Sequence, residues 1–262
     1  MSEQQIRFDD GAAYEKMMGV WSRLVGEQFL DWVGLPQGLR CLDVGCGNGA
    51  FTEFLIGRCK PASVVGIDPS EGQLAFARTR SGVGVATFQQ GDAEELPFAD
   101  KFFDAAFMAL VIFFVPHPAK GLAEMRRVTR PGGTIAAYAW DMPGGGFPLE
   151  PIQAELRALG QKYMVPPSVE VSRLPALRKL WEDGGLEAVE AREITVRRTY
   201  ASFDEFWTTS LSSPSTGGAI AKLAPPDAEI LKARVRERLP ADASGRITYA
   251  SRANAVKGRV PK

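Results

Sequence analysis

Short apolar runs alternate with amphipathic stretches through the first half of the chain. Residues 39–49 read LRCLDVGCGNG, an apolar run that ends in a glycine-rich loop, and a helix-like stretch follows it. A serine at position 70 could cap a second helix, and 118–128 has a helical pattern. The other apolar runs predicted to be strands are 63–67, 85–89, 103–110 and 134–140. Strands that alternate with helices predict an α/β fold, with a parallel sheet covered by helices on both faces.

The pattern changes beyond residue 140. Residues 141–170 are rich in glycine and proline around a possible helix at 150–163, and we interpret them as an insertion. The remaining predicted elements are an amphipathic helix at 174–183, a strand at 187–200, helices near 203–211 and 227–239, and a last strand at 246–256. If the two late strands join the first five in one sheet, the chain is a single domain with a helical elaboration.

The composition excludes several classes of protein. The 262 residues are 45% hydrophobic and 24% charged, which is typical of a globular protein. Lysine plus arginine and aspartate plus glutamate number 31 each, so nothing in the net charge favours binding to nucleic acid. The longest apolar run, 105–115, is too short to span a membrane, and the first ten residues do not resemble a signal peptide. Three cysteines make a disulfide framework improbable, so we expect a cytoplasmic protein. No spacing of side chains predicts a metal site.

The loop at residues 45–50, GCGNGA, fits two nucleotide-binding patterns. It is G-x-G-x-G and also G-x-G-x-x-A, the dinucleotide fingerprint. Asp68 follows the first glycine by 23 residues, a spacing that suits the ribose of a nicotinamide cofactor or of another adenosine. A glycine turn that only packs a helix on a strand is a third interpretation.

The acidic residues near this loop favour a cationic ligand. Asp43 precedes the first glycine by two residues and should point toward the loop, where a carboxylate repels a diphosphate and attracts an ammonium group. Asp92 follows the third predicted strand, where it could accept a hydrogen bond from an adenine amine, and the N–H of Ala93 could reach a ring nitrogen. S-adenosylmethionine carries an ammonium and a sulfonium but no phosphate, so the sequence predicts this cofactor.

Five segments resemble, in order, the motifs of the class I S-adenosylmethionine-dependent methyltransferases, specifically the type 11 group related to the ubiquinone and menaquinone biosynthesis methyltransferases. The segments are LDVGCGNG, GIDPS, GDAEELPF, FDAAFMALVIFF and RPGG. The resemblance implies a Rossmann-like, seven-stranded, mostly parallel sheet with a helical insertion or lid over the acceptor site. It implies one methyltransferase domain over 1–262, with N-terminal cap helices in 1–38, a cofactor-binding core in 39–140, an insertion and helix in 141–186, and sheet completion with helical lid elements in 187–262.

Carried over position by position, the resemblance implies a cofactor site that runs from the N-terminal segment to the fourth strand. The implied residues are Tyr14, Trp21, Asp43, Gly45, Gly47, Gly49, Asp68, Pro69, Ser70, Asp92, Ala93, Met108 and Ala109. Asp68 has an alternative role as an acid that stabilises a helix N-terminus. Tyr14 and Trp21 could equally be aromatic residues of the core.

The expected acceptor is a small hydrophobic or aromatic molecule, because the segments predicted to roof its site are mostly apolar. The candidate residues are Phe113, Phe114, Trp140, Met142, Phe147, Tyr163 and Trp207. His117, the one histidine, is a candidate base for a phenol or enol, or else a loop residue that faces solvent. We expect in-line methyl transfer that leaves S-adenosylhomocysteine. The alternatives are a non-catalytic regulatory or scaffold protein that binds the same cofactor, and a nicotinamide-dependent oxidoreductase.

Overall fold

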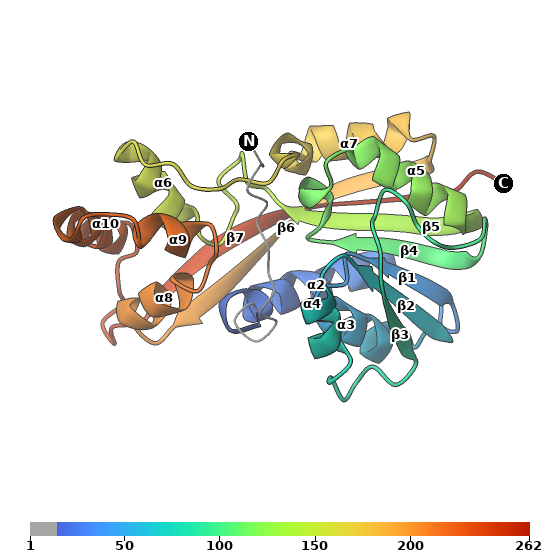
Figure 1. Ribbon diagram of the computed structural model, residues 1–262, viewed down its shortest axis with the longest axis horizontal. Coiled ribbons are helices and arrows are strands. Elements are labelled where there is room, and N and C mark those ends of the chain that lie inside the picture. The colour runs from blue at the N-terminus through green and yellow to red at the C-terminus, as the bar shows by residue number, and fades with distance from the viewer. Residues whose placement is uncertain (1–14) are drawn as a thin grey trace.

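The computed structural model describes residues 15–262, which are built around one seven-stranded sheet (Figure 1). The strand order is β3-β2-β1-β4-β5-β7-β6. The first five strands pair in parallel, β7 runs antiparallel to β5, and β6 runs antiparallel to β7. The strands are β1 (Arg40–Val44), β2 (Ser63–Asp68), β3 (Ala86–Gln90), β4 (Phe103–Ala109), β5 (Thr129–Trp140), β6 (Glu187–Tyr200) and β7 (Ile247–Arg259). This topology confirms the predicted Rossmann-like α/β fold.

Helices cover both faces of the sheet, with α2, α3 and α4 on one side and α5 and α7 on the other (Figure 1). The helices are the π-helix η1 (Glu15–Gly19), α2 (Val20–Val33), α3 (Ala50–Cys59), α4 (Glu71–Ala77), α5 (Pro118–Val128), α6 (Glu150–Ala158), α7 (Leu174–Asp183), α8 (Phe203–Ser210), α9 (Thr216–Ile220) and α10 (Pro225–Arg238), with 3-10 turns η2 (Ile112–Phe114) and η3 (Val169–Ser172). Among the described helices, none has the length and apolar character needed to cross a bilayer.

Aromatic side chains fill the layer between α2, α3 and the sheet. The ring of Phe29 on α2 lies 4.7 Å from that of Tyr138 on β5 and 6.0 Å from that of Phe51 on α3. Phe51 in turn lies 5.8 Å from Phe107 on β4. Because these large side chains are buried together, they fix α2 and α3 on the sheet and position the loop that precedes α3.

The structure moves several of the predicted boundaries, two of them by five residues. β5 begins at Thr129, because Thr129 already pairs with Phe103, and the register shifts before Ala105 pairs with Thr134. The RPGG segment therefore lies within an irregular part of the strand rather than before it. The helix predicted at 150–163 ends at Ala158, and Gly160 follows it in a left-handed conformation with φ of 70°.

The antiparallel pair β6–β7 extends beyond the carboxyl end of β5. Trp140, the last residue of β5, pairs with Ala253, whereas residues 247–252 pair only with β6. Figure 1 shows α6, α8, α9 and α10 grouped around this end of the two strands. We call this region, residues 141–163 and 195–252, the ribbon lobe.

Candidate active site

The glycine-rich loop joins β1 to α3 at the carboxyl edge of the sheet. Gly45, Gly47 and Gly49 have φ values of 73°, 50° and 77°, a region that favours glycine. A Cβ atom on Gly45 would lie 2.5 Å from Val111, so this glycine is needed for packing against the segment after β4. A Cβ atom on Gly47 would come no closer than 3.8 Å to any neighbour, that being Gln73. The backbone at Gly47 is therefore open to the approach of a ligand.

Asp43 lies wholly buried on β1, two residues before the loop. Its Oδ2 accepts a hydrogen bond of 2.6 Å from the Thr52 hydroxyl, and its Oδ1 has no partner among the residues that the structure describes. Burial, with a smaller contribution from the charge of Asp68, raises the pKa of Asp43 to about 7 against the opposing effect of the Thr52 hydrogen bond. A buried carboxylate oxygen without a donor is unfavourable, so this side chain suits the cationic group of a ligand.

Asp68, the last residue of β2, connects the glycine loop to the start of α4. Its Oδ2 accepts from the N–H of Gly47 and its Oδ1 from the N–H of Ser70, both at 2.9 Å. Burial raises the pKa of Asp68, and the two backbone hydrogen bonds oppose that rise. The Ser70 hydroxyl accepts from the N–H of Gln73, which confirms the predicted helix cap. The Pro69 carbonyl accepts from the Gln90 side chain.

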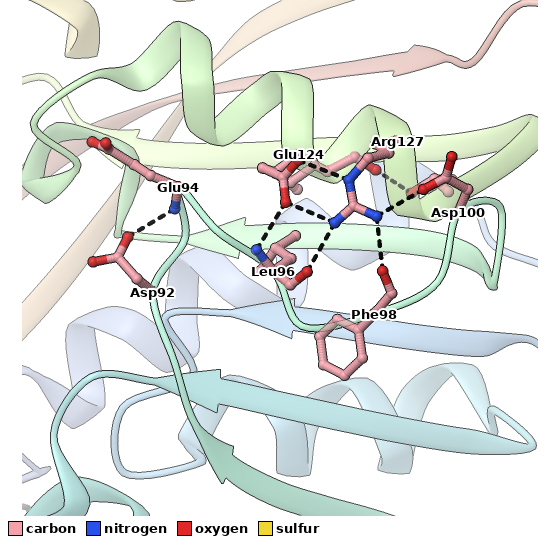
Figure 2. Close-up of polar contacts among 9 residues, drawn as sticks. Asp92, Glu94, Leu96, Phe98, Asp100, Glu124 and Arg127 are labelled. Carbon is pink, nitrogen blue, oxygen red and sulfur yellow. Dashed lines mark hydrogen bonds and ion pairs between the residues drawn. The ribbon is translucent and has the colours of Figure 1, made fainter.

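The segment after β3, which carries Asp92 and Ala93, is held against α5 by a network of hydrogen bonds (Figure 2). The exposed Asp92 accepts from the N–H of Glu94 at 2.8 Å. Further along, Arg127 of α5 binds the carbonyl oxygens of Leu96 and Phe98 and the carboxylates of Asp100 and Glu124. This network fixes the backbone that presents Asp92 at the same edge as Asp43 and Asp68. The sequence analysis missed it.

A second contact that the sequence analysis missed ties η1 to the glycine loop. The Glu15 carboxylate accepts from the Asn48 amide at 3.1 Å and from Arg80 at 2.6 Å. Arg80 also donates to the Asn48 carbonyl at 2.6 Å and to the Glu53 carboxylate at 2.9 Å. We call this group, Glu15, Asn48, Glu53 and Arg80, the loop clamp. It joins η1, the glycine loop, α3 and the segment after α4.

The other predicted cofactor residues lie in different settings, and Tyr14 falls outside the described residues. Trp21 is wholly buried, and its indole N–H donates to the Tyr200 hydroxyl at 3.1 Å. The Met108 side chain points toward α5, since a Cβ atom on Gly121 would lie 3.4 Å from its Cε. Only the backbone of Met108 is left to face a ligand at the sheet edge, and the next residue, Ala109, ends β4 partly exposed.

His117, the candidate base, lies directly before α5 with 75% of its side chain exposed. Its Nδ1 is 3.1 Å from the Glu94 carboxylate, and its backbone N–H donates to the same carboxylate at 2.7 Å. This is the environment of a loop histidine that faces solvent, the alternative that the sequence left open. In the part of the chain that the structure describes, no cluster of histidine, cysteine and acidic side chains could hold a metal ion.

The predicted acceptor residues are divided between the sheet edge and the ribbon lobe. Trp140 is 1% exposed at the end of β5, and the rings of Phe113 and Phe114 in η2 lie 4.6 Å apart at an interplanar angle of 56°. In the ribbon lobe, Phe147 lines a cavity of about 250 Å³. Three further candidates are the half-buried Met142, Tyr163, whose hydroxyl accepts from Arg157, and the buried Trp207, which stacks on Phe203.

Known proteins share both the sequence and the fold of this region. The model of a family described as a methyltransferase domain matches residues 42–137, from β1 to β5. The demethylmenaquinone methyltransferase of Renibacterium salmoninarum is 35% identical over 168 residues, which cover 62% of this chain and 67% of that protein. The chain belongs to the class I S-adenosylmethionine-dependent methyltransferases. This family membership confirms the resemblance noted in the sequence.

Other members of the family match a smaller part of the chain. The fatty-acid O-methyltransferase of Mycolicibacterium smegmatis is 38% identical over 41% of this chain and 40% of its own length. The phthiotriol/phenolphthiotriol dimycocerosates methyltransferase 1 of Mycobacterium ulcerans is matched over 49% of its length, so the chain spans under half of these two relatives.

A solved structure shares the fold over nearly the whole chain. The YcgJ protein of Bacillus subtilis has a TM-score of 0.61 at 18% identity over 91% of this chain and 98% of that one.

Proposed function

We propose that the whole chain acts as one methyltransferase domain that transfers the methyl group of S-adenosylmethionine to a small, largely apolar acceptor. The observation that carries this proposal is the unpaired, buried Oδ1 of Asp43 beside the open backbone of Gly47. A diphosphate would meet a negative charge there, whereas an ammonium group would supply the missing donor. Family membership supports the same cofactor.

The residues at the sheet edge suit the separate parts of this cofactor. Asp43 and the glycine loop would hold the methionine end, and Asp68 retains lone pairs for the ribose hydroxyls beside its two backbone bonds. Asp92 and the N–H of Ala93 would bind the adenine, at a segment fixed by Arg127. When bound, S-adenosylmethionine supplies a methyl group already activated by a sulfonium, so the chain's main tasks are to align the acceptor and exclude water.

The transfer itself needs one lone pair from the acceptor. That lone pair forms the new bond to the methyl carbon, the carbon–sulfur bond breaks with its electrons on sulfur, and S-adenosylhomocysteine remains. Any proton on the acceptor atom leaves to solvent or to a base. His117 faces solvent and is bound to Glu94, so its position supports no catalytic role.

The ribbon lobe supports an apolar acceptor. Phe147, Leu239 and Tyr249 line its cavity together with the charged Glu150 and Arg238, and the buried Trp140 ends β5. Two relatives are named for a fatty acid and for demethylmenaquinone, compounds with hydrocarbon parts that an apolar wall would accommodate. Three buried free cysteines accord with the reducing cytoplasm that we propose as its location.

Binding and turnover together test this proposal. Calorimetry should detect S-adenosylhomocysteine binding to the full chain, with no comparable binding of NAD. Radiolabelled methyl transfer should then be measured against fatty acids, phenols, quinols and amines. Binding of NAD without S-adenosylhomocysteine would favour an oxidoreductase and refute the proposal. Cofactor binding without transfer to any compound would instead favour a regulatory or scaffold role.

A further inference from the structure

Two buried tryptophans differ in the hydrogen bonding of their indole N–H groups. The N–H of Trp181 on α7 donates to the carbonyl oxygen of Ile135 at 3.1 Å. The N–H of Trp140, at the carboxyl end of β5, has no partner among residues 15–262. Buried donors are almost always hydrogen-bonded, because an unpaired one destabilises the fold. The Trp140 N–H is therefore a candidate for contact with a ligand.

A second unpaired polar group projects from the same face of the sheet. Ser251 of β7 is 3% exposed, and its hydroxyl has no partner in the described part of the chain. Trp140 is paired with Ala253, and the side chains of directly paired residues in antiparallel strands share a face. Ser251 stands two residues from Ala253 and so projects to that face as well. Both donors thus lie where the ribbon lobe begins.

The polar atoms of the aromatic side chains around these two donors already form hydrogen bonds within the protein. The Trp21 ring lies 6.5 Å from Trp140 and 5.1 Å from Tyr249. The Trp21 N–H donates to the Tyr200 hydroxyl, and the Tyr249 hydroxyl donates to a carbonyl oxygen of the loop before α6. A ligand here would meet a largely aromatic wall on which the Trp140 N–H and the Ser251 hydroxyl have no partner among the described residues.

Space for the body of a ligand adjoins this wall. The cavity of about 250 Å³ lies between α6, α10 and β7, and Tyr249 belongs both to its lining and to the aromatic wall. Phe147, Pro151 and Leu239 contribute apolar surface to it, and Glu150 and Arg238 add charged side chains. The apolar part of the lining suits the body of a molecule that carries one polar end.

We infer that the methyl acceptor presents a carboxylate or phenolate oxygen to the Trp140 N–H and the Ser251 hydroxyl. This inference rests on the proposed methyltransferase function. An indole N–H donates and never accepts, so its partner must carry a lone pair, which an ammonium group lacks. Hydrogen bonds from two donors favour the ionised form of the oxygen.

The ionised oxygen also determines the reaction. Its lone pair forms the carbon–oxygen bond as the carbon–sulfur bond breaks, and no proton remains to be removed. The reaction yields a methyl ester or ether and S-adenosylhomocysteine without a base.

Matched pairs of probes test the chemistry of the acceptor. Decanoate is compared with decylamine and 1-naphthol with 1-naphthylamine, by calorimetry on the full chain saturated with S-adenosylhomocysteine. In at least one pair, the oxygen compound should bind about tenfold tighter than its amine. Equal or tighter binding of both amines, or no binding of either oxygen compound, would overturn the inference. Failure to load S-adenosylhomocysteine would instead count against the proposed function.

Substitutions separate a ligand contact from a structural one. Trp140→Phe should raise the Kd of the bound oxygen compound about tenfold, and Ser251→Ala about threefold, with the affinity for S-adenosylhomocysteine unchanged. Trp140→Phe should lower Tm less than Trp181→Phe does, because both substitutions remove the same buried ring volume and only Trp181 also loses a hydrogen bond. The control Trp181→Phe should lower Tm and leave binding of the compound unchanged. Unchanged acceptor binding in Trp140→Phe, or a Tm loss as large as in Trp181→Phe, would refute the assignment.

Discussion

Two regions of the molecule obtain their polar groups in different ways. One is the proposed cofactor side of the sheet edge, which comprises Asp43, the glycine loop, Asp68 and Asp92, and the other is the ribbon lobe. On the cofactor side, short loops supply backbone N–H groups, and Asp43, Asp68 and Asp92 come from strand ends next to them. In the ribbon lobe, the polar groups belong to side chains from distant segments, such as the ion pair between Glu155 and Arg238. Local chain geometry therefore places the ligand-facing groups of the first region, with the loop clamp and Arg127 as long-range supports, whereas side-chain packing places those of the second. Substitutions in one region should leave the ligand of the other unaffected.

The largest expected effect is that of Asp68→Ala on cofactor affinity. The substitution removes the acceptor proposed for the ribose and the bonds to Gly47 and Ser70. Hydrogen bonds to a charged group contribute about 1.5–3 kcal/mol, so the Kd of S-adenosylhomocysteine should rise roughly 10-fold to 150-fold. Calorimetry measures it, with Asp183→Ala, a surface ion-pair variant, as the control. Unchanged affinity in Asp68→Ala would leave Asp68 only its role at the start of α4.

The titration of Asp43 should make cofactor binding depend on pH. Its pKa is raised to about 7 in the free protein, and the ammonium group of the ligand requires the ionised carboxylate. Binding should therefore release a proton below pH 7, and affinity at pH 6 should be about tenfold lower than at pH 8, with little change above. Calorimetry in two buffers of different ionisation enthalpy measures the released proton.

The variant Asp43→Asn isolates this effect. It should bind S-adenosylhomocysteine more weakly, without the pH dependence. In the free protein the raised pKa makes stability fall as pH rises from about 4 to about 7, because the folded state holds the proton more tightly than the unfolded state. Asp43→Asn should remove that decline as well. A wild-type affinity that is flat between pH 6 and 8 would contradict the assignment of Asp43 to the ammonium group.

A smaller effect is expected when the loop clamp is broken. Arg80→Ala removes hydrogen bonds from a side chain that is 13% exposed, whereas the carboxylates of Glu15 and Glu53 are about one-third exposed and partly screened by solvent. The KM for S-adenosylmethionine should rise about fivefold, equivalent to about 1 kcal/mol, with kcat little changed. The matched control is Arg78→Ala, whose partner Glu71 is exposed, and its KM should change less than about twofold. If Arg80→Ala lowered kcat and left the KM for S-adenosylmethionine unchanged, the proposed role of the loop clamp in cofactor binding would be wrong.

The sequence predicted the cofactor side well because its determinants are local. The glycine loop and the Ser70 cap depend on residues within a few positions of one another, and both occur in the structure as predicted. The helices α5 and α7 have the predicted bounds for the same reason. The roles of Asp43, Asp68 and Asp92 toward a ligand remain predictions.

Contacts between distant segments were beyond the sequence analysis. Glu15 and Arg80 are far apart in the chain, and no periodic pattern relates their positions. The unpaired N–H of Trp140 depends on which acceptors are absent around it, whereas hydrophobic patterning reports only that the ring is buried. The early start of β5 is set by pairing with β4, which the turn residues of RPGG concealed.

The smallest effect on the cofactor is expected from Glu155→Gln in the ribbon lobe. The Glu155 carboxylate is 9% exposed and pairs with Arg238 and Arg234, so it joins α6 to α10. Both guanidinium groups are about half exposed and can be solvated when the charge is lost, which limits the cost to about 0.5–1 kcal/mol. Tm should fall by roughly 1–4 °C, while the KM for S-adenosylmethionine stays within the error of the wild type. A change in that KM as large as in Arg80→Ala would mean that the lobe and the glycine loop are coupled, and the two regions would have to be treated as one.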